Sequence, residues 1–159
     1  MKIRVICVGK LKERFYTDAA DEFKKRLSRF CELEICELAD EKVAEDPSPA
    51  EIARVTGIEC RRMLERIGRG EYVVALDGRG KQLSSEAFAQ KLSSVMLGGA
   101  SRIDLLIGGS HGLTDEVRAR ADMVLSFSMM TFSHQIFRIM LLEQVYRAFK
   151  IINNEPYHK

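Results

Sequence analysis

Residues 71–113 read EYVVALDGRGKQLSSEAFAQKLSSVMLGGASRIDLLIGGSHGL, and this segment decides the fold. Two apolar runs, YVVAL and RIDLLI, each lead into a glycine-bearing turn, and the amphipathic segment SSEAFAQKLSSVML lies between them behind a serine cap. The pattern predicts strand, helix, strand. Nearly continuous apolar strands of this kind are typical of a parallel sheet that is buried on both faces.

The same alternation continues on both sides of this unit. Further strands are expected at residues 2–8, 31–38 and 121–128, and further helices at residues 13–30, 50–67, 113–121 and 134–152. Strands that alternate with helices predict an α/β fold with a mostly parallel sheet flanked by helices. We expect residues 1–159 to form a single domain. In the first helix, spacing predicts that Phe15, Phe23, Leu27 and Phe30 face the core.

Composition excludes several classes of protein. Hydrophobic residues make up 46% of the chain and charged residues 30%, as in ordinary globular proteins. No apolar run approaches the roughly 20 residues that a membrane span needs, and the first residues do not resemble a secretion signal. The four cysteines form no C-x-x-C pair, so no metal site is expected. We expect a cytoplasmic protein without a membrane partner.

Charge is distributed unevenly although the formal net charge is only +2. Residues 1–30 carry nine Lys and Arg against four Asp and Glu, whereas residues 31–60 carry two against nine. A local excess of positive charge can bind the phosphates of a nucleic acid in a protein that is not basic overall. Charge alone slightly favours the alternative, that these are ordinary solvated helix faces.

Small residues gather where three of the expected strands end. These strand ends read LDGRG at residues 76–80, IGGSHG at residues 107–112 and FSMMT at residues 127–131. In open α/β sheets, ligands bind beyond the carboxyl ends of the strands, and glycine there allows the backbone to approach a ligand closely. The three turns predict a site that recognises a flat heterocycle through backbone hydrogen bonds.

Sequence motifs for phosphate and nucleotide binding give little support to other sites. The chain has no G-x-G-x-x-G after its first strand and no P-loop. The segment IGGSHGL could hold an anion at the start of the following helix, which leaves a phosphate-binding α/β enzyme as an alternative. The histidines are His111 in that turn, His134 at the start of the last helix and His158 in the tail.

The last expected helix, residues 134–152, is apolar on most of its sides. Its apolar residues are Ile136, Phe137, Ile139, Met140, Leu141, Leu142, Val145, Tyr146 and Phe149. A helix with such a broad apolar surface has to bury more than one face. We expect one face to pack on the sheet and another to pack on a second copy of the chain, in a homodimer.

Several motifs resemble those of the RlmH family of SPOUT-class methyltransferases. They are VGKLKERF, ELADEK, ALDGRGK, LLIGGSHGL, LSFSMMTFSHQIFRIMLLEQVYRAF and the terminal NEPYHK, which occur in order over nearly the whole chain. The resemblance implies a C-terminal trefoil knot, a homodimer, S-adenosylmethionine as cofactor, and methylation of N3 of a pseudouridine in large-subunit ribosomal RNA. By motif position, it places the cofactor contacts on Leu76, Gly108, Phe127, Ser128, Met129, Met130, Thr131 and Phe132.

The same resemblance directs attention to residues that could catalyse the transfer. The imide N3 must lose a proton, and His134, Tyr157 and His158 are candidates to help, with Arg138 or Arg147 available to hold a phosphate. We expect the tail to close over the cofactor pocket, in its own chain or across a dimer. Because the chain is small, we expect its RNA target to be the assembled ribosome. A non-catalytic knotted RNA-binding module remains the alternative.

Three positions depart from the pattern of the family. Ser133 stands where relatives often have proline before the histidine of the last turn, which could loosen that loop. Ile58 and Cys60 stand where relatives often have lysine and glycine. Neither of these two positions lies in the expected cofactor turns.

Overall fold

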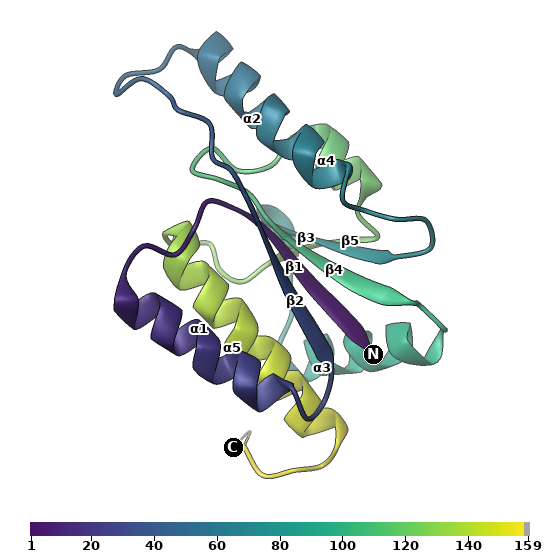
Figure 1. The fold of residues 1–159 in the computed structure, drawn as a ribbon. Coiled ribbons are helices and arrows are strands. Elements are labelled where there is room, and N and C mark those ends of the chain that lie inside the picture. The colour runs from purple at the N-terminus through teal and green to yellow at the C-terminus, as the bar shows by residue number, and fades with distance from the viewer. Residues whose placement is uncertain (158–159) are drawn as a thin grey trace.

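The computed structural model describes residues 1–157, in which strands and helices alternate strictly along the chain (Figure 1). The strands are β1 (Lys2–Val8), β2 (Glu32–Leu38), β3 (Tyr72–Gln82), β4 (Arg102–Ile107) and β5 (Met123–Ser126). The helices are α1 (Arg14–Leu27), α2 (Pro49–Leu64), α3 (Ser85–Leu97), α4 (Asp115–Arg120) and α5 (His134–Ile152). The predicted α/β fold is confirmed, and α5 has the bounds that its sequence pattern predicts.

The strands form one sheet in the order β2-β1-β4-β3-β5, and every neighbouring pair is parallel. The carboxyl ends of all five strands therefore lie along one edge of the sheet. Between β3 and β5 the register shifts, so that Leu76 and then Lys81 pair with Leu125. Residues 77–80 bulge out of the ladder at this point and line the same edge.

Helices cover both faces of the sheet, with α1, α3 and α5 on one face and α2 and α4 on the other (Figure 1). Residues of β1, β3 and β4 alternate between the two resulting cores, as Val5 and Ile6 do. Helix α5 packs against both α1 and α3 as well as the sheet. This placement accounts for most of its broad apolar surface within one chain.

Side-chain caps determine where most of the helices begin. Ser48, Ser84, Thr114 and Ser133 each accept a hydrogen bond from a backbone N–H in the first turn of α2, α3, α4 and α5, respectively. Such a cap satisfies a donor that the helix itself leaves unpaired and typically contributes about 1 kcal/mol. At α5, Ser133 is the cap, so its hydrogen bond fixes the start of the helix directly before His134.

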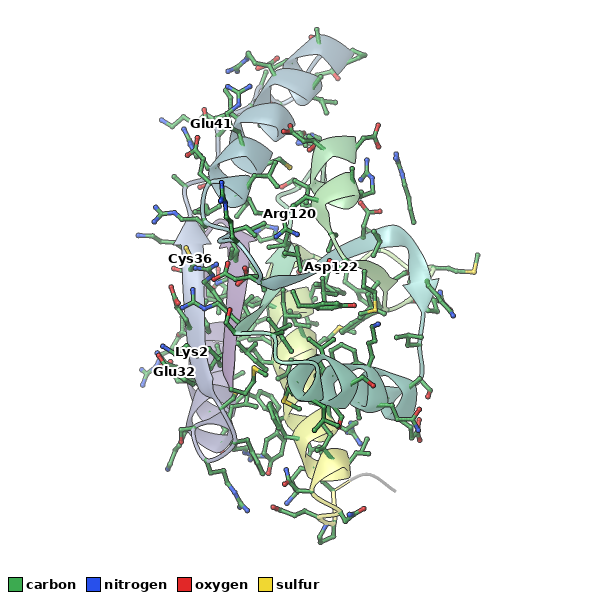
Figure 2. The ribbon with its side chains drawn as sticks, turned by 90° about the vertical axis from the view of Figure 1, so that its right-hand side faces the viewer. Lys2, Glu32, Cys36, Glu41, Arg120 and Asp122 are labelled. Carbon is green, nitrogen blue, oxygen red and sulfur yellow. The ribbon has the colours of Figure 1, made fainter. Side chains whose placement is uncertain are left out.

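Charged residues pair near the amino ends of the strands. Figure 2 shows Lys2 next to Glu32 on adjacent strands, and their charged atoms are 3.4 Å apart; it also shows Arg120 of α4 next to Asp122. Deeper in the sheet, the Arg4 guanidinium donates to both oxygens of the fully buried Asp104 at 2.9 Å. Burial raises the pKa of Asp104 to about 6, and the hydrogen bond from Arg4 opposes that rise. The exposed pairs contribute little, so the Arg4–Asp104 pair is the main ionic link between β1 and β4 away from the carboxyl edge.

The structure differs from the sequence prediction at Phe15. Phe23, Leu27 and Phe30 pack in or against the core, but the Phe15 side chain is 63% exposed. Helical spacing indicates which face a residue occupies, but it does not indicate how far the covering elements extend along that face. Phe15 lies in the first turn of α1, where its ring contacts that of Tyr16 at 4.3 Å between centroids.

Residues 1–157 were expected from composition to contain neither a membrane span nor a metal site. No helix among them combines the length and the apolar character that crossing a membrane requires. Within the same residues, no group of three or more His, Cys, Asp or Glu side chains is arranged so that it could hold a metal ion.

Candidate functional site

A pocket of about 610 Å³ lies at the carboxyl edge of the sheet, where β3, β4 and β5 end and α5 begins. Its volume is within the usual range for small-molecule sites. All eight residues expected to contact a cofactor line it: Leu76, Gly108, Phe127, Ser128, Met129, Met130, Thr131 and Phe132. The three glycine- and serine-bearing strand ends therefore converge on one cavity.

Close backbone packing holds two of these strand ends in place. A Cβ at Gly108 would lie 2.5 Å from the carbonyl oxygen of Gly112, and a Cβ at Gly80 would lie 2.6 Å from the backbone of Leu125. Contacts that short do not occur, so only glycine allows these segments to pass each other. Gly78 lines the same pocket, but a Cβ there would meet no atom within 4 Å.

The lining of the pocket carries almost no charge. Asp77 is its only carboxylate, and neither lysine nor arginine is among the lining residues. Arg118 of α4 donates to Asp77 Oδ2 at 2.6 Å, and the backbone N–H of Arg79 donates to Asp77 Oδ1 at 2.9 Å. Because Asp77 is paired, the groups that the pocket offers to a ligand are mainly backbone groups, serine hydroxyls and apolar side chains.

The segment after β5 forms the outer wall of the pocket. Ser128 shapes this segment, because its carbonyl accepts from Ser126 Oγ at 3.0 Å and its Oγ accepts from the Met130 N–H at 3.0 Å. The Phe127 ring packs on Phe137 of α5 with centroids 4.8 Å apart. Met129 is 96% exposed, so the apolar side chain at the rim has no partner within the described part of the chain.

His134 lies between this pocket and a smaller cavity of about 230 Å³. Its imidazole packs on the backbone at Gly9. The ring is so close that a Cβ on this glycine would lie 3.5 Å from His134 Nε2. Burial lowers the pKa of His134 below its usual 6.5, and the nearby positive charge of Arg138 lowers it further. The imidazole is therefore neutral at pH 7 and can accept a proton.

Arg138 does not lie where a phosphate-binding arginine would. Its side chain is 1% exposed, and its guanidinium donates to the carbonyl of Gly9 at 2.8 Å and to the carboxylate of Glu37. It does not line the pocket. Arg138 lies one helical turn after His134 on α5. Its side chain points inward, toward the ends of β1 and β2.

Tyr157 lies on the body of α5, away from the pocket. Its hydroxyl donates to Glu143 Oε1 at 3.1 Å, its ring meets the ring of Tyr146 edge-on at 4.9 Å, and Arg147 lies over it at 4.7 Å. In this arrangement the tail, as far as Tyr157, does not close over the pocket of its own chain. His158, the other candidate in the tail, lies outside the described residues.

The turn at Gly109 is poorly suited to hold an anion. Its carbonyl accepts from the Gly112 N–H at 3.0 Å, so this donor is already used within the turn. Helix α4 is short, and its first turn already contains the acidic residues Asp115 and Glu116. The positive end of this helix is therefore already neutralised.

Comparison with known proteins identifies the family. Residues 1–158 match the family model described as "Predicted SPOUT methyltransferase". The chain belongs to the SPOUT methyltransferase family. It is 50% identical to Ribosomal RNA large subunit methyltransferase H of Clostridium perfringens (strain 13 / Type A) and 48% identical to that of Streptococcus equi subsp. zooepidemicus. Both alignments cover 100% of each chain, and the resemblance to the RlmH family is confirmed.

The fold of this SPOUT methyltransferase is similar to that of a probable methylase family protein from Haemophilus influenzae Rd KW20. The TM-score is 0.56, and the match covers 99% of this chain and 70% of the other. The two sequences are 13% identical, so this similarity concerns the fold alone.

Sequence reasoning missed three residues that shape the site of this SPOUT methyltransferase. Arg118 of α4 pairs with Asp77, which lies in the bulge of β3, and Gly9 supports the His134 ring. Glu59 of α2 is buried beside the smaller cavity, where it accepts from the Glu41 N–H at 2.9 Å, and burial raises its pKa. Asp77 itself belongs to the strand end LDGRG that the sequence indicated, but its partner Arg118 had no signal there.

The glycine contacts make a direct prediction. Gly108→Ala should lower the free energy of unfolding by about 1–3 kcal/mol, because its Cβ would overlap the backbone of Gly112. Gly78→Ala, in the same pocket, should stay within about 0.5 kcal/mol of the parent protein. Urea unfolding of both variants measures the difference, and equal stability of the two would contradict this account of the turn.

Proposed function

We propose that this chain transfers a methyl group from S-adenosylmethionine to N3 of a pseudouridine in large-subunit ribosomal RNA, on the assembled ribosome in the cytoplasm. The observation that carries the proposal is the uncharged pocket at the carboxyl edge, with a neutral histidine at its rim. Membership of the SPOUT family and relatives named as ribosomal RNA methyltransferases support it.

The chemistry of the pocket fits this cofactor. S-adenosylmethionine is a positively charged sulfonium with a flat adenine, and it supplies an electrophilic methyl group. Backbone groups of the turns at Leu76, Gly108 and residues 127–132 would hold the adenosyl portion, and Phe137 adds an apolar wall. A lining without lysine or arginine favours a cationic ligand and disfavours a nucleoside phosphate, which argues against the phosphate-binding alternative.

We propose that His134 is the general base. The imide N3 is weakly acidic and must lose its proton before or during attack. A neutral imidazole at the rim of the pocket can accept that proton, and the burial that lowers its pKa keeps it neutral at pH 7. Arg138 then acts as a positioning residue, since it ties the start of α5 to Gly9 and Glu37.

A homodimer would complete this site. Ile136 is exposed on α5, and with Ile139 and Met140 it lines an apolar groove of about 440 Å³ between α5 and α3. Glu143, which holds Tyr157, lines the same groove. A second copy that covers this groove would carry its own tail close to the pocket, so we propose that the tail acts across the dimer.

Two further properties of the family belong to the proposal. We propose that residues 1–159 act as one SPOUT domain and that its C-terminal part is threaded as a trefoil knot. The close passage of Gly80 beside the Leu125 backbone supports the knot, because it brings the segment after β3 against the strand that leads into α5.

The cofactor assignment is tested by calorimetry together with mapping of ribosomal RNA. S-adenosylmethionine should bind the purified protein with one site per chain, and ATP should not bind. Ribosomes from a strain that lacks the protein should gain one methyl group, on a pseudouridine of the large-subunit RNA, when protein and cofactor are added. Absence of cofactor binding would favour the non-catalytic RNA-binding module, and binding of ATP would favour the phosphate-binding enzyme.

The role of His134 predicts a particular dependence on pH. Because its pKa is lowered, the acidic limb of kcat/KM, where the imidazole gains a proton, should have its midpoint below 6.5, the usual pKa of histidine. His134→Ala should lose about 10²- to 10⁴-fold in rate and should lack this acidic limb. An unchanged acidic limb in His134→Ala, measured with cofactor at saturation, would show that another group accepts the proton.

Mixed dimers test whether the tail acts across subunits. One chain lacks residues 156–159 and has an intact pocket, and the other carries His134→Ala and has an intact tail. Each should be nearly inactive alone, and a mixture that is unfolded and refolded together should regain activity, because one of its sites receives both parts. If the mixture stays inactive while light scattering shows mixed dimers, the tail acts within its own chain.

A further inference from the structure

The loop between β1 and α1, residues 9–13, is attached to the start of α5. The Lys12 N–H donates to Gln135 Oε1 at 3.1 Å, and Arg138 donates to the carbonyl of Gly9 at 2.8 Å. Gly9 also lies against the His134 ring. Figure 1 shows this loop passing beside the first turn of α5 before α1 begins. Any group that the loop carries is therefore placed next to the proposed base.

The loop and the first turn of α1 present positive charge to solvent. Lys10, Lys12 and Arg14 are exposed, with Glu13 as the acidic residue among them. Within residues 1–157, neither lysine forms an ion pair. Arg14 pairs only loosely with Asp18, at 3.5 Å between two exposed side chains, which is worth little in solution. The charge of Lys12 is also close enough to contribute to the low pKa of His134.

An exposed aromatic ring follows directly after these cations. Phe15 is 63% exposed, and Phe15 and Tyr16 form a tilted pair at 4.3 Å between ring centroids. A large apolar ring that stays in solvent contributes nothing to the core. Cations interleaved with an open aromatic face are the combination that binds unpaired nucleotides, since the cations contact phosphates and the ring stacks on a base.

We propose that Lys10, Lys12, Arg14 and Phe15 form an RNA platform that holds the strand on one side of the target nucleotide. In this platform the three cations contact phosphates and Phe15 stacks on an unpaired base next to the one that is methylated. The inference rests on the proposed function, and it names the residues that recognise the RNA rather than those that transfer the methyl group.

The alternative is that the exposed Phe15 ring contacts a protein partner or a second copy of this chain. The charges around Phe15 favour RNA, because two unpaired lysines and an arginine in a weak, exposed ion pair complement phosphates. The apolar groove between α5 and α3 is lined by Phe23 of α1 but by no residue of this platform, so the surface proposed for the dimer and the RNA platform are separate.

The test measures binding of the full chain to purified ribosomes by co-sedimentation over a range of salt concentrations. Phe15→Ala should weaken binding by about 5- to 150-fold, the range that loss of one stacked base gives, and Phe15→Tyr should restore it. Leu97→Ala is the matched control, because Leu97 is an apolar side chain at the far end of α3 that is even more exposed, at 86%, than Phe15. It should bind as the parent protein does.

The cations are tested in the same assay. Lys10→Ala and Lys12→Ala should each reduce the slope of log affinity against log salt by about 0.7–0.9, as expected for one lost phosphate contact. Arg69→Ala removes the same charge from the exposed connection between α2 and β3, at the opposite edge of the sheet, and should leave the slope unchanged. The affinity for S-adenosylmethionine should be the same in all variants.

Each other result overturns the platform. If Phe15→Ala binds ribosomes as tightly as Leu97→Ala, the ring does not stack on RNA. If Phe15→Ala halves the mass seen by light scattering, the ring belongs to an interface between copies. Failure of the proposed function looks different, because the parent protein would then bind ribosomes through the platform without adding a methyl group.

Discussion

The Arg138 guanidinium is the contact on which the arrangement of the site depends. It is fully buried and joins three segments that are far apart in the sequence: α5 itself, the end of β1 at Gly9 and the end of β2 at Glu37. Glu37 keeps 31% of its side chain exposed, so the ion pair is only partly buried, whereas the hydrogen bond to the Gly9 carbonyl is buried. Together these two contacts hold the start of α5 at the carboxyl edge of the sheet, and with it His134 and the loop at residues 9–13.

The neutrality of the pocket determines which ligands it accepts. A carboxylate, Asp77, does line it, but Arg118 and a backbone N–H satisfy that carboxylate from outside. Backbone groups at strand ends that glycine packing keeps rigid can then select a ligand by shape and hydrogen bonding. His134 is kept neutral by a different cause, because burial and the positive charge of Arg138 both disfavour the imidazolium. The ligand preference of the pocket and the protonation state of His134 therefore have separate origins at the same edge.

Different sides of α5 have different tasks in the proposed mechanism. Its first turn carries His134 and anchors the basic loop, while Ile136, Ile139, Met140 and Glu143 line the apolar groove, and Glu143 also holds Tyr157. The residues proposed to bind RNA do not line this groove. RNA binding and dimerisation can therefore be lost separately, which is what makes the two proposals distinguishable.

Much of the fold and part of the site could be predicted from local patterns in the chain. Apolar runs, breakers and one serine cap predicted every strand and helix, including the bounds of α5, and glycine and serine at three strand ends predicted a common pocket. These features depend on residues near each other in the sequence. The inward course of Arg138, the pairing of Asp77 with Arg118, the exposure of Phe15 and the docking of residues 9–13 on α5 required the tertiary structure. Each depends on which distant segment lies opposite, and a one-dimensional pattern carries no such information.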